Sequence, residues 1–134
     1  MIKEIQFQRS KGRIFAMAEN YATIGDWECR AEFVPGYNAE GDPRGSLPNG
    51  TYMHVRAEIT DGMYGPAYGN FYITSGDPRG RDIHGGGSGL ADPYAPYQGW
   101  VPTYGCLRMQ NADGVELSQM IIDAGNDVVL TVVE

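Results

Sequence analysis

The sequence is poor in cysteine, in basic residues and in long apolar runs. Its 134 residues include 2 cysteines, too few for a disulfide framework. No apolar run is long enough to span a bilayer, and the N-terminal residues lack the apolar core of a secretory signal. We therefore exclude a disulfide-rich scaffold, expect no membrane span, and predict no particular export route.

Positive charge is outnumbered by negative charge. The chain has 10 Lys and Arg against 17 Asp and Glu, a formal net charge of -7. Nucleic-acid binders need a basic surface to replace phosphate counterions, whereas the basic residues here are scattered among carboxylates. We expect no nucleic-acid partner. The length predicts a single domain, residues 1–134, and we expect a monomer.

Turn-forming and aromatic residues are abundant instead. The 19 Gly, 8 Pro and 9 Tyr predict a mainly β fold with long loops. Alternating polarity predicts strands over residues 2–7, 13–18, 27–33, 50–59, 70–74, 81–84 and 128–133. One helix is predicted after residue 106, where an apolar stripe recurs at helical spacing. The stripe consists of Leu117, Met120, Ile121 and Ala124. Asn111 or Asp113 could cap the start of the helix, and Gly125 fits its C-terminal end.

The two cysteines lie in different settings. Cys29 is on the apolar face of its predicted strand, where a free cysteine packs as a small hydrophobe. Cys106 lies between an aperiodic loop and the predicted helix. Gly105 before it permits a sharp turn and a close approach by a substrate, and Arg108 after it favours the nucleophilic thiolate.

His84 is the candidate base for Cys106. It ends a predicted strand on the face opposite Ile83, and three glycines follow it. A general base must lie within roughly 3 Å of the proton that it removes. The residues alone leave two alternatives: a Cys106–His84 pair brought together by folding, or an inert cysteine and a surface histidine.

Two segments resemble the YkuD-type L,D-transpeptidase signature, in which His-Gly and a loop precede Ser/Thr-His-Gly-Cys. They are Gly80-Arg81-Asp82-Ile83-His84-Gly85 and Thr103-Tyr104-Gly105-Cys106-Leu107-Arg108-Met109. Upstream, residues 47–52 resemble the Pro-x-Gly-x-Tyr/Phe pattern that begins an early strand in that family. The compact size is similar to the family's antibacterial effector branch and to phage-borne wall enzymes.

The resemblance implies a β-sandwich-like catalytic domain that acts on peptidoglycan stem peptides in the periplasm or cell wall. The implied activity is that of an L,D-transpeptidase or L,D-carboxypeptidase, with Cys106 as nucleophile and His84 as base. The main-chain carbonyl of Gly85 would orient the histidine. Backbone N–H groups around Tyr104, Gly105 and Cys106 would hold the oxyanion.

The resemblance also assigns substrate contacts. Arg108 would fix the site or bind a substrate carboxylate, a task suited to its fork of donors. Apart from the resemblance, the aromatic residues of the long Gly-rich loop, Tyr97 and Trp100, leave two alternatives: a lid over substrate, or side chains that simply pack that loop. No cofactor or metal is expected, because neither histidine shows paired ligand spacing. Tyr104 replaces the family's usual histidine, which leaves open a non-catalytic peptidoglycan-binding relative of the same fold.

Overall fold

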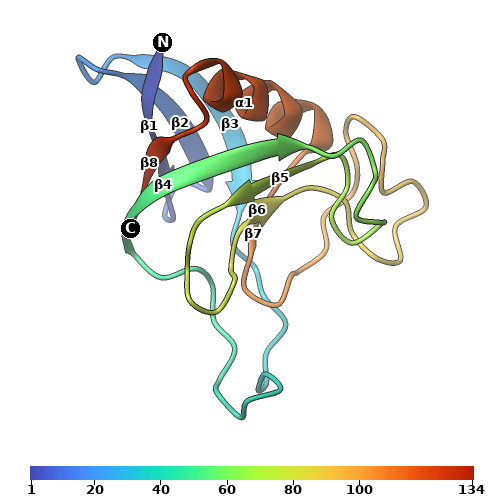
Figure 1. Ribbon diagram of the computed structural model, residues 1–134. Coiled ribbons are helices and arrows are strands. Elements are labelled where there is room, and N and C mark those ends of the chain that lie inside the picture. The colour runs from blue at the N-terminus through green and yellow to red at the C-terminus, as the bar shows by residue number, and fades with distance from the viewer.

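The computed structural model describes residues 1–134 as eight strands and one helix (Figure 1). The strands are β1 (Ile2–Gln8), β2 (Arg13–Ala18), β3 (Thr23–Arg30), β4 (Gly50–Ile59), β5 (Phe71–Thr74), β6 (Ile83–His84), β7 (Leu107–Met109) and β8 (Val128–Val133). Helix α1 (Asn111–Asp123) lies between β7 and β8. The prediction of a mainly β fold with one helix after Cys106 is confirmed. The helix is not of the length and apolarity needed to cross a membrane.

The predicted sandwich is wrong, because the strands form a closed barrel in the order β1-β2-β3-β7-β6-β5-β4-β8. Strand β8 closes it: Leu130 is opposite Ile5 of β1 in a parallel pair and opposite Tyr52 of β4 in an antiparallel pair. Each sheet of a sandwich has free edges, whereas every strand here has two neighbours. One buried face per strand gives the same alternation in both architectures, so the pattern alone favoured neither.

The barrel interior holds the hydrophobic core. Fully buried side chains come from strands around the whole circumference, among them Ile5, Phe7, Ile14, Phe71, Ile73, Ile83, Leu107 and Leu130. Cys29 is a fully buried member of this core, as predicted, and burial raises the pKa of its thiol. Both cysteines are free. Only one thiol is therefore in contact with solvent, that of Cys106.

Helix α1 contacts β4 and β5, and Gly114 allows the close approach. A Cβ at Gly114 would overlap the ring of Phe71. We expect Gly114→Ala to lower the free energy of unfolding by about 1–3 kcal/mol because of this overlap, although alanine stabilises an exposed helix relative to glycine. Urea denaturation measures the change. The exposed Glu116 of the same helix is the control, since Glu116→Ala should stay within about 0.5 kcal/mol of the parent. A more stable Gly114→Ala variant would contradict this packing.

Candidate active site

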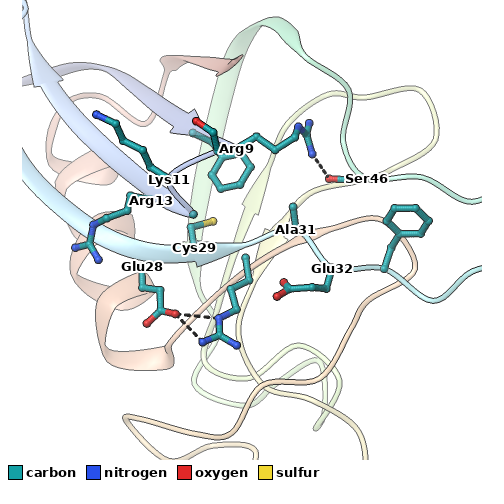
Figure 2. Close-up of a pocket in the computed structure, with 13 residues that line it drawn as sticks. Arg9, Lys11, Arg13, Glu28, Cys29, Ala31, Glu32 and Ser46 are labelled. Carbon is teal, nitrogen blue, oxygen red and sulfur yellow. Dashed lines mark hydrogen bonds and ion pairs between the residues drawn. The ribbon is translucent and has the colours of Figure 1, made fainter. Parts of the chain in front are cut away.

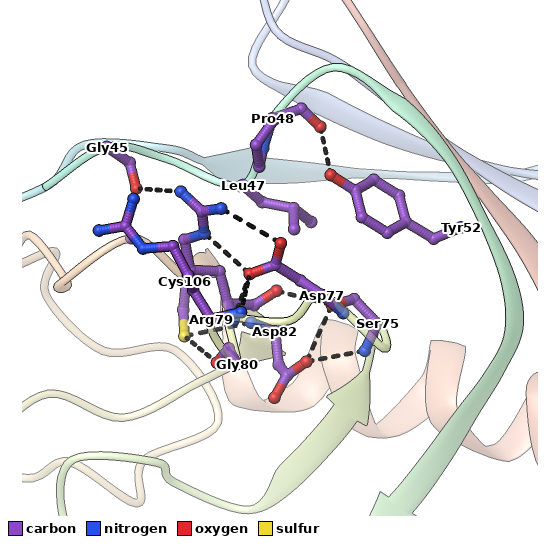
Figure 3. Close-up of polar contacts among 12 residues, drawn as sticks. Gly45, Leu47, Pro48, Tyr52, Ser75, Asp77, Arg79, Gly80, Asp82 and Cys106 are labelled. Atoms are coloured by element: carbon purple, nitrogen blue, oxygen red, sulfur yellow. Dashed lines mark hydrogen bonds and ion pairs between the residues drawn. The ribbon is translucent and has the colours of Figure 1, made fainter. Parts of the chain in front are cut away.

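A short parallel strand pair brings the candidate nucleophile and base to one end of the barrel. Ile83 of β6 is opposite Leu107 of β7, and His84 is opposite Arg108. This register places Cys106, just before β7, beside Asp82, just before β6. The main-chain N–H of Asp82 donates to the sulfur of Cys106 at 3.3 Å (Figure 3). A hydrogen bond to the sulfur stabilises its thiolate form.

The turn before Cys106 is held rigidly. Gly105 has φ 135°, and a Cβ there would lie 2.6 Å from the carbonyl oxygen of Gly45, so glycine is required. The hydroxyl of Thr103 accepts from the N–H of Gly105 at 3.0 Å and donates to the carbonyl of Cys106 at 2.7 Å. The N–H of Gly105 is thus not available for an oxyanion, contrary to our prediction. The N–H groups of Tyr104 and Cys106 make no hydrogen bond within the chain.

His84 has one ring nitrogen fixed and the other free. Its side chain is 4% exposed, and Nδ1 lies 2.9 Å from the carbonyl oxygen of Gly85. A carbonyl only accepts, so Nδ1 carries the proton and Nε2 has the lone pair. Nε2 makes no hydrogen bond within the chain, and it is not among the buried polar atoms without a partner. The lone pair of Nε2 is therefore accessible and not used by another group of the chain.

Two tyrosines hold the imidazole of His84 from the sides. The ring of Tyr72 is stacked with it, at 8° and 6.0 Å between centroids. The ring of Tyr68 meets it edge-on at 5.1 Å. These contacts and the bond to Gly85 leave the imidazole little freedom to turn.

Burial sets the resting charge of Cys106 and His84. Burial lowers the pKa of His84 to about 4, opposed by the hydrogen bond to Gly85. Burial also raises the pKa of Cys106, opposed by the N–H of Asp82. At neutral pH Cys106 is therefore a thiol and His84 a neutral imidazole rather than a preformed ion pair. The two side chains line the same cavity, and no hydrogen bond joins them in this structure.

One cavity, of about 450 Å³, contains both Cys106 and His84. Three of its lining residues are arginines, Arg79, Arg81 and Arg108, and none is Asp or Glu. This is unexpected in a chain of net charge -7. Since cationic walls without carboxylates attract negative ligands, the cavity suits an anionic substrate.

Arg108 is a buried cation without a carboxylate partner. Its side chain is 4% exposed, and Nη1 donates to the carbonyl of Val101 at 2.9 Å. Its Nε is buried without a partner, whereas Nη2 has no partner and is not fully buried. An unpaired buried charge is costly, so a ligand carboxylate at Nη2 would offset a penalty already present in the fold.

The structure of the chain is similar to known structures, whereas its sequence alone gives no match. The chain matches no protein-family model and no curated protein. Its structure superposes on the L,D-transpeptidase (residues 123-326) of Xylanimonas cellulosilytica DSM 15894 over 97% of this chain, with a TM-score of 0.56 and 15% identity. For L,D-transpeptidase 1 of Mycobacterium tuberculosis the coverage is 98%, the TM-score 0.53 and the identity 9%. The chain has the L,D-transpeptidase fold.

A third solved structure, Bd1075 of Bdellovibrio bacteriovorus, matches 97% of the chain with a TM-score of 0.57 and 12% identity. At such identities the likeness establishes the fold alone. The chain spans 59%, 60% and 48% of the lengths of the three proteins. The common part thus contains the barrel of the L,D-transpeptidase fold, and each neighbour has further residues outside it.

In this L,D-transpeptidase fold the predicted aromatic contacts lie elsewhere. Tyr97 is 68% exposed and does not line the cavity of Cys106. Trp100 lies in a smaller neighbouring pocket, where the guanidinium of Arg30 lies 4.3 Å from the centre of the Trp100 ring. Gln98, between them, is buried and bonds to the carbonyl of Gly86, which fixes the loop in this orientation. The tyrosines that line the cavity are Tyr68, Tyr72 and Tyr104.

Sequence reasoning missed the network behind the pair. The hydroxyl of Tyr72 donates to one carboxylate oxygen of Asp82 at 2.6 Å. The N–H of Ser75 donates to the other at 2.7 Å (Figure 3). Tyr72 therefore contacts both the imidazole of His84 and the residue whose N–H reaches Cys106. The available signal was that Asp82, just before β6, and His84 are two residues apart in a predicted strand and therefore share one face of it.

Asn111 was expected at most to cap the helix. The helix N-cap is Gln110, without a side-chain cap bond. The side chain of Asn111 accepts from the N–H of Asn70 at 3.1 Å and donates to the carbonyls of Pro93 and Ala95. It thereby joins the loop before β5 to the loop after β6, and the two loops lie side by side in Figure 1.

A larger groove, of about 900 Å³, lies at the turn between β1 and β2 and the end of β3 (Figure 2). It includes Cys29, but the thiol there is fully buried and no histidine lines the groove. The other histidine, His54, bonds to Asp127 at 3.1 Å in a different pocket. Of the cavities described, only that of Cys106 is lined by both a cysteine and a histidine.

The depressed pKa of His84 makes stability depend on pH. A pKa of about 4 in the folded state, against about 6.5 unfolded, means that the unfolded chain binds the extra proton first as pH falls. The stability that the neutral form of His84 contributes to the folded state is fully present above about pH 6.5. It is lost as the pH falls toward 4, by about 3 kcal/mol in total. We expect the stability difference between the parent and His84→Gln to shrink over this interval, measured by urea denaturation at pH 7.5, 5.5 and 4.5. A constant difference would show that His84 titrates normally.

Proposed function

We propose that this chain is a cysteine-dependent acyltransferase that acts on peptidoglycan stem peptides, as an L,D-transpeptidase or L,D-carboxypeptidase. The observation that carries the proposal is that the thiol of Cys106 and the free Nε2 of His84 open into one cavity. The fold supports it, since two of its neighbours are L,D-transpeptidases.

In the first step Cys106 attacks the carbonyl carbon that precedes the terminal residue of the stem peptide. Nε2 of His84 takes the thiol proton, while Nδ1–H stays bonded to the carbonyl of Gly85 and stabilises the imidazolium. The N–H of Asp82 stabilises negative charge on the sulfur. The free N–H groups of Tyr104 and Cys106 are the candidate oxyanion donors, and losing one such donor costs about 3 kcal/mol.

In the second half of the reaction the thioester first forms and is then cleaved. The imidazolium of His84 gives its proton to the leaving amine, the C–N bond breaks, and Cys106 remains acylated. A water or a second amine then loses a proton to Nε2 and attacks the thioester. The C–S bond breaks, and the thiolate of Cys106 takes the proton back from His84. Water as acceptor gives a carboxypeptidase, and an amine gives a transpeptidase.

The charge of the cavity fits such a substrate. Stem peptides carry several carboxylates, and the unpaired Nη2 of Arg108 is the buried donor that would bind one of them. The rings of Tyr68 and Tyr72 supply an apolar wall beside His84. Action on such a substrate would take place in the periplasm or cell wall.

Incubation with a disaccharide tetrapeptide, followed by mass analysis, tests the proposal. Loss of the terminal D-alanine identifies a carboxypeptidase, dimers identify cross-linking, and a mass shift with added D-amino acid identifies exchange. An unchanged substrate, with Cys106 no more reactive toward a carbapenem than in the unfolded chain, would indicate a non-catalytic binding protein instead.

A further inference from the structure

A second group of cations lies at the cavity of Cys106, separate from Arg108: Arg79 lines the cavity, and Arg44 contacts a tyrosine that lines it. Arg108 is two residues after Cys106, and Tyr104 is two residues before it. The side chain of Tyr104 is 71% exposed and lines the cavity. The guanidinium of Arg44 lies 4.5 Å from the centre of its ring. A guanidinium stacked on a ring keeps its in-plane N–H donors free for a ligand.

Arg79 belongs to the same group. Its Nη2 donates to the carbonyl of Pro43 at 3.1 Å, which holds the side chain near the loop that carries Arg44. The next residue, Gly80, has its carbonyl oxygen 3.9 Å from the sulfur of Cys106 (Figure 3). Arg79 is thus anchored by its guanidinium and lines the same cavity as Cys106.

Neither Arg44 nor Arg79 has a carboxylate partner, and this separates them from Arg81. Arg81 pairs with Asp77 at 2.8 Å, and the two side chains are 12% and 4% exposed. The charge of Arg81 is therefore neutralised by a buried pair. Arg44 makes only a main-chain contact, to the carbonyl of Pro35 at 3.3 Å. Arg79, which lines the cavity, and Arg44, which stacks on the cavity-lining Tyr104, are thus two cations without a carboxylate partner.

We propose that Arg79 and the stacked pair Arg44–Tyr104 form a subsite for the α-carboxylate of the amino acid that leaves, or attacks, at the Cys106 thioester. The inference rests on the proposed function and adds a specificity to it. In the forward step the C–N bond breaks, the C–S bond forms, and the thiol proton passes through His84 to the amine of the leaving amino acid. In the reverse step the amine of a free amino acid attacks the thioester, the C–N bond forms, the C–S bond breaks, and the proton returns through His84 to the sulfur. In both steps the carboxylate next to that amine is held by the subsite.

Two pairs of substrates test the subsite. The first is a disaccharide tetrapeptide with a terminal D-alanine or D-alaninamide, and the second is free D-methionine or D-methioninamide as acceptor. We expect the parent to prefer the free carboxylate by about tenfold or more in kcat/KM, since the subsite gains a charge-assisted hydrogen bond only from the carboxylate. Mass analysis of products gives both ratios.

Variants locate the preference. Arg79→Gln and Arg44→Gln are each expected to reduce the ratio several-fold through loss of the free-carboxylate reaction, with the amide reaction little changed. Arg56→Gln is the matched control, because Arg56 is exposed on β4 and makes no ion pair. Iodoacetamide labelling of Cys106 should be equal in all these proteins.

The outcomes separate the two proposals. Equal turnover of carboxylate and amide substrates would overturn the subsite and leave the proposed acyl transfer standing. A preference that survives in the Arg44→Gln/Arg79→Gln double variant would also overturn it, and would assign carboxylate recognition to Arg108. No turnover of any substrate, with an unreactive Cys106, would remove the proposed function and the subsite with it.

Discussion

Cys106→Ala is expected to reduce turnover of a disaccharide tetrapeptide by at least about a thousandfold, because the variant lacks the atom that forms the thioester. Triad enzymes that lose the nucleophile show losses of this order or larger. The thiol is also the one that carbapenem would acylate, so a mass adduct should disappear in the variant. Mass analysis of the substrate and of the intact protein measures both effects.

Cys29→Ala is the matched control for this prediction. Cys29 is fully buried in the core and does not line the cavity of Cys106. We expect turnover close to that of the parent and a loss of stability of about 1–2 kcal/mol from the missing sulfur. Activity that survives in Cys106→Ala and disappears in Cys29→Ala would contradict the assignment of the nucleophile.

His84→Gln is expected to lower kcat/KM by about a hundredfold to ten-thousandfold, the range for loss of a general base. The raised pKa of Cys106 means that little thiolate exists at neutral pH without a base to accept the proton. In the variant, alkylation of Cys106 should therefore increase with pH until the thiol ionises by itself. Rates of iodoacetamide labelling between pH 5 and 10 follow this change.

The parent protein should show a different pH profile. With a pKa of about 4, His84 remains a neutral base at pH 5.5, so labelling there should stay close to its rate at pH 7. An ordinary histidine would have lost most of its base form by pH 5.5. His54→Gln, at an exposed residue bonded to Asp127, is the control and should leave the profile unchanged. An acid limb near pH 6.5 would contradict a buried, neutral His84.

Local patterns in the sequence were sufficient for most elements. Strands β1, β2 and β8 and helix α1 lie where alternation or a helical stripe predicted them. The prediction for β3 was displaced, since the strand ends at Arg30 and not at residue 33. Alternation over residues 50–59 predicts one regular strand. In β4 a register shift between Tyr52 and Val55 interrupts it and leaves Met53 57% exposed.

The closure of the barrel could not be read from those patterns. It depends on two parallel pairs, β1 with β8 and β6 with β7, between segments that are far apart in the chain. Strands β6 and β7 have 2 and 3 residues, too few to show a period. Only the resemblance of the His-Gly and Gly-Cys segments to a known signature indicated that they meet.

Residue types predicted the candidate pair better than its surroundings. His84 and Cys106 stand out chemically, whereas Tyr68 and Tyr72 are two tyrosines among 9. The aromatics nearer to Cys106 in sequence, Tyr97 and Trp100, are the ones that the sequence offers as substrate contacts. The orientation of that loop follows from the buried bonds of Gln98 and Asn111, which are long-range and leave no local signal.

The position of β8 between β1 and β4 has a consequence for folding during synthesis. Until residues 128–133 leave the ribosome, β1 and β4 each have an unpaired edge, and Leu130 is missing from between them. Cys106 and His84 are by then already synthesised, but the wall that supports their strands is incomplete. Pairing of such distant segments is slow, so the thiol should become selectively reactive only after β8 has emerged and paired with both strands. Nascent chains should be sensitive to protease up to that point.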